Sequence, residues 1–315
     1  MHYRINNLKG QLDYPDQKQI ANDCNLINYQ MRCSLLHALM VTLLTASLLI
    51  GCSSLKNTSD FSASAFKGIQ KFEEIDYGFE KNCLENCYSK TIAELNLESP
   101  PCNCAEDKKG DQVTLAIYKA VRGYLDGLTK LSNNKLTAYN LESLSDELKK
   151  IENPSLKIEK SQVEAYGTIS RILLRSVTDK YRKHQLRDYL VAGNEPFQVL
   201  IACLKFNLSE NLSGKLSVQK EILKEYYFVL LKDTTLTTWE RREAVETYYK
   251  KRDQIELIKK QLLSYSKTLQ KIGQGEVNLA EAIDKPGDQE SKAQLNLFVS
   301  ELQQLIDNFN KLTIQ

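Results

Sequence analysis

The sequence is poor in the residues that punctuate β structure and in those that most often perform chemistry. Its 315 residues include only 13 glycines, 6 prolines and 3 histidines. So few glycines and prolines argue against a turn-dense β-sandwich or β-barrel. The 42 basic and 40 acidic side chains leave a net charge of +2, which is not the basic footprint of a nucleic-acid-binding protein. The apolar share of 42% is typical of a globular protein, neither disordered nor a polytopic membrane protein.

One hydrophobic run stands out from this ordinary composition. It extends over residues 35–50, follows the basic residue Arg32, and ends in Leu49-Ile50-Gly51-Cys52 before two serines. At about 15 residues the run is shorter than the roughly 20 that a membrane-spanning helix needs, but it has the length of a signal-peptide core. The small Gly51 lets the chain enter a peptidase site in extended form, and the Cys52 thiol can then accept a diacylglycerol.

The segment Leu49–Cys52 resembles the lipobox of bacterial lipoprotein precursors. The resemblance covers residues 31–52 and carries no information on the fold downstream. It implies a signal peptide over residues 31–51, cleavage between Gly51 and Cys52, and acylation of Cys52 that attaches the protein to a lipid bilayer. Ser53 follows the acceptor instead of Asp, which implies sorting to the outer membrane, facing the periplasm.

The position of this segment within the chain leaves three interpretations open. A signal peptide normally starts at the initiator methionine, yet residues 1–30 precede Met31 and are mostly polar. We favour a true translation start at Met31, with residues 1–30 a mis-assigned or disordered leader. The other interpretations are an internal signal anchor and a buried core helix over residues 35–50. The expected organisation is therefore leader, signal peptide, lipidated cysteine with a tether over residues 52–60, and a helical domain over residues 61–315.

The cysteines that follow the signal peptide predict disulfides, because export leads to an oxidising compartment. Cys83 and Cys87 are four residues apart on one face of a helix, and Cys102 and Cys104 alternate onto one side of an extended segment. We favour the pairs Cys83–Cys104 and Cys87–Cys102 because the chain reverses between them; Cys83–Cys102 with Cys87–Cys104 stays open. A four-thiolate zinc site is the alternative, although the usual two-residue knuckle spacing is missing. Cys203 has apolar neighbours and is predicted to be a buried thiol.

From about residue 60 onward, apolar residues recur at intervals of three and four, which indicates helices. Capping-box patterns begin at Ser161, for a helix reaching about residue 192, and at Thr237. A heptad seam follows Thr237 and contains Tyr248, Ile255, Ile258, Leu262, Tyr265, Leu269 and Ile272. The sequence therefore predicts an all-α fold, an elongated antiparallel helical bundle with long, coiled-coil-like helices that is stapled near its start by disulfides.

Several boundaries of these helices can be predicted from single residues. Asp111 is expected to cap the helix that follows it, and the segment Gly193–Pro196 to end one helix and begin the next. Gly273 and Gly275 are expected to end the heptad helix. A short helix is expected over residues 141–151.

No known catalytic motif is recognisable. The sequence contains no nucleophile elbow, no phosphate-binding loop and no dinucleotide-binding glycine pattern. His184 is the single histidine that would remain after cleavage, and its basic neighbours are typical of a surface residue. We predict no catalytic residue, no metal site, no cofactor and no nucleic-acid partner, and hence a protein that is not an enzyme.

Two non-enzymatic functions fit these features. The first is a lipid-anchored periplasmic scaffold or interaction module for a protein partner in the cell envelope. The second is an immunity, inhibitor or exclusion lipoprotein that binds an incoming toxin or transfer apparatus, with the loop over residues 83–104 as its binding tip. The tyrosine-rich segments 225–228 and 247–250 are candidate partner-binding aromatics in either case, or half-buried tyrosines at helix crossings.

Overall fold

The structure is a computed structural model, and it describes residues 56–98, 102–133, 160–176, 182–283 and 288–313, without the side chains of 173–185. The chain divides into two compact units, Met1–Cys52 and Ser53–Gln315, and every described residue belongs to the second. The leader, the signal peptide, Gly51, Cys52 and the short helix expected over 141–151 therefore lie outside the described residues.

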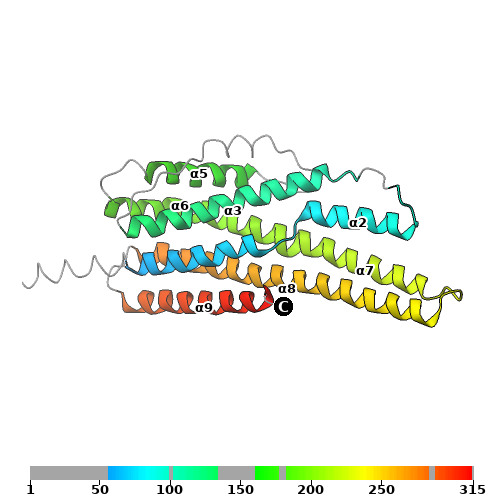
Figure 1. Cartoon of the computed structure of the whole chain (residues 1–315). Helices are drawn as coiled ribbons and strands as arrows, with labels where there is room; N and C mark the ends of the chain where they lie inside the picture. Colours follow the sequence, from blue (N-terminus) through cyan, green and yellow to red (C-terminus); the bar gives the residue numbers. More distant parts are fainter. Residues whose placement is uncertain (1–55, 99–101, 134–159, 177–181, 284–287, 314–315) are drawn as a thin grey trace, which may run out of the picture. The chain divides into compact units, whose positions relative to one another are not determined.

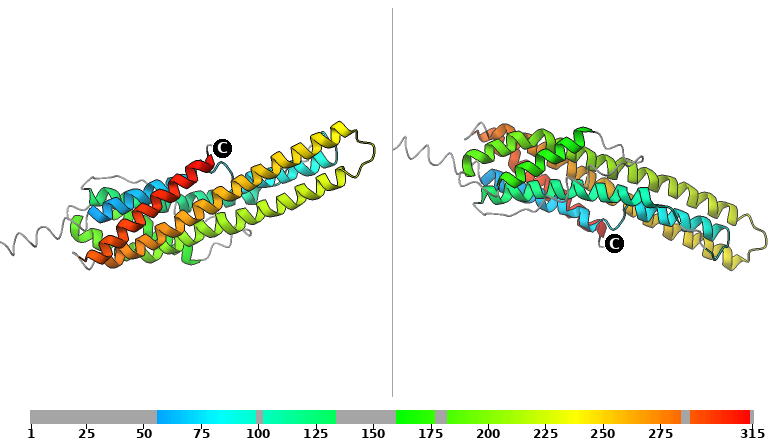
Figure 2. Two further views of the ribbon diagram at one scale, coloured as in Figure 1. Left: turned by 90° about the horizontal axis from the view of Figure 1, so that it is seen from below. Right: turned by 90° about the horizontal axis from the view of Figure 1, so that it is seen from above.

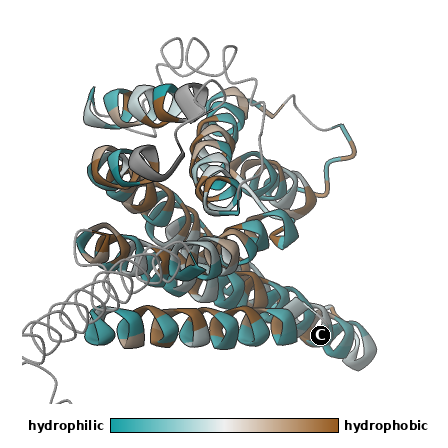
Figure 3. Cartoon of the chain, turned by 90° about the vertical axis from the view of Figure 1, so that its left-hand side faces the viewer, coloured by the Kyte–Doolittle hydropathy of each residue, from teal (hydrophilic) through white to brown (hydrophobic). Residues whose placement is uncertain are grey.

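All regular structure in the described part of the chain is helical, which confirms the predicted fold class. The helix of residues 56–69 and α2 run in one direction, α3 returns beside them, and α8 returns along α6 and α7 before α9 reverses again (Figures 1 and 2). The elements in chain order are 56–69, η1 (Gln70–Glu74), α2 (Phe79–Ala93), α3 (Ala105–Ser132), α5 (Lys160–Ser176), α6 (Arg182–Lys205), η2 (Phe206–Leu212), α7 (Ser213–Leu230), α8 (Thr238–Ala282) and α9 (Gln289–Thr313). Hydrophobic and hydrophilic residues recur in turn along the helices, as expected for helices that pack one apolar face into a bundle (Figure 3).

Helix α8 is the longest element and packs against α6, α7 and α9. Its 45 residues correspond to a length of about 67 Å at 1.5 Å per residue. The predicted capping box is present, since the Thr237 hydroxyl accepts a hydrogen bond from the Glu240 amide and the Glu240 carboxylate accepts one from the Thr237 amide. Most of the predicted heptad seam is buried, namely Ile255, Leu262, Tyr265, Leu269 and Ile272.

The prediction that α8 ends at Gly273 and Gly275 was wrong, because both glycines lie inside the helix. They are points of close approach between helices. A Cβ atom on Gly275 would overlap the ring of Phe61, which is fully buried, and one on Gly273 would lie 2.9 Å from the side-chain oxygen of Gln198. Gln198 also donates a hydrogen bond of 3.0 Å to the Gly273 carbonyl. Because glycine has no side chain, the first helix and α6 can therefore pack directly against the backbone of α8.

The break predicted at Gly193–Pro196 is also absent, because α6 continues through Pro196. A Cβ atom on Gly193 would lie 2.6 Å from the ring of Tyr124, so this glycine again marks close packing between helices. The irregularity in this part of the chain lies further on, in the π-helical η2, which joins α6 to α7. There the buried Asn207 donates a hydrogen bond of 3.1 Å to the Thr114 hydroxyl on α3.

The first helix begins earlier than predicted. Residues 56–60, which the sequence assigned to a tether, are helical, and Thr58 and Ser62 are fully buried. The hydroxyl of Ser62 donates to the Thr58 carbonyl and accepts a hydrogen bond of 2.9 Å from Thr129 on α3. These contacts belong to the folded domain, so residues 56–60 are part of the first helix and not of the tether predicted over residues 52–60.

The single helix predicted from Ser161 to about residue 192 was wrong. Helix α5 ends at Ser176, and α6 packs beside it (Figure 1). Ser161 lies inside α5, one residue after the start of this helix at Lys160.

Replacement of Gly275 by alanine tests the close approach. We expect Gly275→Ala to lower the free energy of unfolding by about 1–3 kcal/mol, because the added methyl group overlaps the buried ring of Phe61. Gly214→Ala is the matched control, since a Cβ atom there meets nothing within 4 Å and alanine favours a helix by up to about 1 kcal/mol. Urea unfolding followed by circular dichroism measures both. Equal midpoints for the two variants would contradict the close packing.

Candidate functional site

Two disulfides hold α2 against the beginning of α3. They join Cys83 to Cys104 and Cys87 to Cys102, with Cα–Cα distances of 5.8 and 6.0 Å. This is the connectivity favoured from the sequence. The pairing uses all four sulfur atoms, so the zinc-site alternative does not hold for these cysteines. Cys203 lies outside the disulfides and is buried, as expected.

A carboxylate on α3 caps the amino terminus of α2. Asp111 accepts hydrogen bonds of 2.8 and 2.9 Å from the amides of Phe79 and Glu80. The prediction that Asp111 caps its own helix was wrong, because α3 already begins at Ala105. Burial raises the pKa of Asp111, and the two amide hydrogen bonds oppose that effect. The cap therefore fixes the start of α2 from a neighbouring helix.

A polar cluster joins α2 to α7. The Tyr77 hydroxyl donates a hydrogen bond of 2.7 Å to Glu85, and the Gln219 amide donates one of 3.0 Å to the same oxygen. Asn82, which is buried, donates to Gln219 at 3.0 Å. Burial, together with the nearby carboxylate of Glu85, raises the pKa of Tyr77, so this hydroxyl keeps the proton that it donates.

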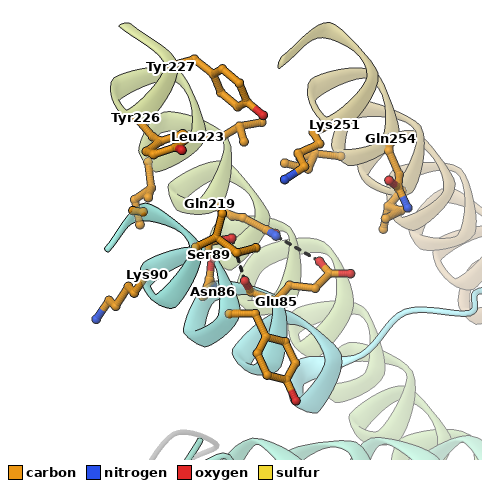
Figure 4. Close-up of a pocket in the computed structure, with 16 residues that line it drawn as sticks. Glu85, Asn86, Ser89, Lys90, Gln219, Leu223, Tyr226, Tyr227, Lys251 and Gln254 are labelled. Atoms are coloured by element: carbon orange, nitrogen blue, oxygen red, sulfur yellow. Dashed lines mark hydrogen bonds between the residues drawn. The ribbon is translucent and has the colours of Figure 1, made fainter. Parts of the chain in front are cut away.

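A groove with a volume of about 370 Å³ lies between α2, α7 and α8. Figure 4 shows α2 and α8 on its two sides, with α7 behind. Its apolar lining comes from all three helices: Ile92 and Ala93 on α2, Ile222 and Leu223 on α7, and Ile255 and Ile258 on α8. The polar cluster around Glu85 closes one end. The groove has the size and the mostly apolar lining of binding sites in proteins.

Exposed apolar side chains border the groove in helical register. On α2 and its end they are Tyr88, Ile92 and Leu95, of which Leu95 is 89% exposed. On α7 they are Val218, Ile222 and Val229. Spacings of four and seven residues place Tyr88 with Ile92 on one face of α2, and Val218, Ile222 and Val229 on one face of α7. Each face is apolar and has no covering element among the described residues.

Leu95 has an unusual backbone conformation for a leucine. Its φ of 51° lies in the left-handed region, at the position where helices commonly end in glycine. The amide of Asn96 donates to the Thr91 carbonyl at 3.1 Å, which completes this type of helix end. A leucine there costs about 1–2 kcal/mol relative to a right-handed conformation, and its exposed side chain recovers none of this through burial.

The tyrosine-rich segments meet where α7 crosses α8. Tyr227 is buried and packs on Tyr248 with ring centroids 5.7 Å apart, so this pair belongs to the helix crossing. Tyr226 lines the groove, whereas Phe228 and Tyr249 are exposed. The segments therefore contribute both to packing and to the surface beside the groove.

Glu276 on α8 is a buried carboxylic acid that the sequence pattern did not reveal. It is fully buried and accepts a hydrogen bond of 2.6 Å from the Tyr124 hydroxyl, while its second oxygen has no hydrogen-bond partner. Burial raises the pKa of Glu276 to about 7, although the hydrogen bond from Tyr124 opposes the shift. Glu276 does not line the groove, and within the described part of the chain its hydrogen-bond partner is Tyr124. It is a residue of the packed core.

Neither a metal site nor a membrane span is present in the described ranges. No group of three or more His, Cys, Asp or Glu side chains there is placed to hold a metal ion. None of the helices in those ranges combines the length and apolar character needed to cross a membrane. The side chain of His184, and the predicted lipidation residues Gly51 and Cys52, are outside the described part.

Comparisons of the chain with protein-family models, with curated proteins and with solved structures found no match.

Removal of the disulfides tests their role in holding α2. We expect the combined replacement of Cys83, Cys87, Cys102 and Cys104 by serine to lower stability, since each bridge closing such a loop contributes about 3 kcal/mol. Amide hydrogen exchange should accelerate in α2 more than in α8. Cys203→Ala is the control and should leave exchange in α2 unchanged. Unaltered protection of α2 in the serine variant would show that the hydrogen bonds alone hold this helix.

The buried carboxyl group predicts a pH dependence of stability. The folded protein holds the Glu276 proton more tightly than the unfolded chain, whose glutamates titrate near 4.5, so stability falls as pH rises from about 4.5 to about 7. We expect Glu276→Gln to be more stable than the parent above pH 7, by roughly 3 kcal/mol, and similar at pH 4. Chemical denaturation at pH 4 and pH 8 measures this, and an equal difference at both values would contradict it.

Proposed function

We propose that this protein is a membrane-anchored lipoprotein of the bacterial cell envelope that acts as a non-catalytic scaffold or interaction module. The anchor is the acylated Cys52 of the Leu49–Cys52 lipobox, and the following Ser53 favours the outer membrane, facing the periplasm. Two disulfides support an exported protein, because such bonds persist in oxidising compartments.

The groove between α2, α7 and α8 is the observation that carries the binding role. Its lining is mostly apolar, and exposed apolar side chains lie beside it on two helices. Contiguous exposed apolar surface of this kind marks sites of interaction with other molecules. We therefore assign the binding of a protein partner to this groove.

One observation supports the second candidate function, that of an immunity, inhibitor or exclusion lipoprotein. The segment proposed as the binding tip, residues 83–104, includes most of α2, which forms one side of the groove. Both functions thus use the same surface and differ in the origin of the partner. A partner from the cell's own envelope favours the scaffold, and a protein arriving from another cell favours the second function.

Lipid attachment is tested by metabolic labelling with an alkyne analogue of palmitate. We expect the parent protein to carry the label and the Cys52→Ala variant to lose it. The intact mass of the parent should equal that of a chain that begins at Cys52 and carries acyl chains. Cys33→Ala is the matched control and should keep the label, because residue 33 lies in the part that cleavage removes. An unlipidated chain that begins at Met1 would contradict the anchor.

The binding surface is tested by photo-crosslinking in intact cells of the source bacterium. A photoreactive amino acid at Ile222 lies in the groove, and one at Leu263 lies on an exposed position of α8 outside it. We expect an adduct with a protein at Ile222 and none at Leu263. Equal adducts at both positions, or none at Ile222, would contradict binding at the groove.

A further inference from the structure

The groove has the geometry of an incomplete four-helix arrangement. Three helices surround it: α7 packs against both α2 and α8, and α2 and α8 form its two sides (Figure 4). The α7 lining of the groove extends from Gln219 to Tyr227, which is about 12 Å of helix. That length matches about two turns of a further helix lying along α7.

Two lysines at the groove form no ion pair with the residues that the structure describes. Lys90 on α2 and Lys251 on α8 both line it and are exposed, and neither forms an ion pair within the described residues. Lys220 on α7, by contrast, pairs with Glu256 at 2.7 Å. The one acidic residue of the lining, Glu85, is already occupied by Tyr77 and Gln219. The lining therefore carries two lysines against one carboxylate, which is an excess of one positive charge, and the hydrogen bonds of Glu85 hold that carboxylate to Tyr77 and Gln219.

We propose that the groove binds an amphipathic helix of a partner protein, whose apolar face is flanked by acidic residues that reach Lys90 and Lys251. This inference rests on the proposed function and specifies the chemistry of its partner. The apolar face would cover Ile222 and Ile92 and complete the fourth side of the arrangement, a recognised mode of helix-in-groove binding. The lysines would set the orientation of the helix and exclude basic segments, because like charges would oppose one another.

The polar rim favours a helix over a lipid acyl chain as the occupant. Asn86 and Ser89 on α2 and Gln254 on α8 line the groove beside its apolar residues. An acyl chain has no group that can bond with these side chains, whereas the polar flanks of a helix have many. In Figure 4 the Lys251 side chain extends from α8 toward α7, where it can meet a carboxylate on a bound helix.

The experiment uses the full chain in intact cells, with the photoreactive residue at Ile222, and identifies the captured peptide by mass spectrometry. We expect a segment with apolar residues at intervals of three and four, flanked by Asp or Glu. The combined charge reversal Lys90→Glu and Lys251→Glu should lower the adduct yield about tenfold. Lys250→Glu is the matched control, since it is the adjacent exposed lysine and does not line the groove.

A charge exchange completes the test. Replacement of the captured acidic residues by lysine should restore the adduct yield in the Lys90→Glu, Lys251→Glu variant, because the attraction is then re-formed with reversed signs. All variants are compared at equal protein level and with both disulfides formed.

The possible results separate the two proposals. An adduct with lipid, with a second copy of this chain, or with a segment that lacks acidic residues would overturn the inference about the partner. A protein adduct whose yield is unchanged by the charge reversal would overturn it as well. The proposed binding role would survive this result, and it would also survive the capture of a partner segment that lacks acidic residues. Absence of any adduct specific to Ile222 would overturn the binding role itself.

Discussion

The structure depends on how closely two neighbouring helices approach the second half of α8. Gly275 leaves room for the buried ring of Phe61, and Gly273 leaves room for Gln198, so the first helix and α6 both lie against the α8 backbone. Protein interiors tolerate few voids and little overlap, and a single methyl group at such a point is therefore significant. The same close packing encloses Glu276, which follows Gly275 directly and is fully buried with one hydrogen bond from Tyr124. The close approach at Gly275 and the pH dependence expected from Glu276 thus lie in the same region of contact.

The first half of α8 has a different environment, and this difference produces the groove. Helix α2 buries only Phe79, Asn82 and Thr91, so an apolar core does not hold it in place. Two disulfides, the cap from Asp111 and the hydrogen bonds around Glu85 hold it there instead. A helix fixed by covalent and polar contacts can leave its apolar side chains exposed, as Tyr88 and Ile92 are. That exposure is what makes a binding role for this surface physically reasonable.

Charged groups also differ between the two halves of α8: one acidic group is buried in the core, and the lysines of the groove are exposed. The buried carboxyl group of Glu276 lies in the packed core, where burial favours its neutral form. The lysines of the groove lie at the surface, where they are exposed and available to a partner. A chain with nearly equal numbers of acidic and basic residues can therefore still present a local excess of one sign at one site. Such local excesses determine orientation and selectivity more than affinity.

The sequence by itself determined the helical fold, the capping box at Thr237 and the burial of most of the seam in α8, and it favoured the observed pairing of Cys83 with Cys104 and Cys87 with Cys102 over the alternative. These follow from periods and spacings within short segments, which local geometry controls. Only the tertiary structure decided that helices continue through Gly193 and Gly275, that Asp111 caps a neighbouring helix, and that α2, α7 and α8 enclose a groove. Each of these depends on atoms that are distant in the chain. Glycine is common at the ends of helices, and it also occurs inside a helix where a neighbouring helix packs closely. The sequence does not distinguish the two cases, because the difference lies in the neighbouring helix.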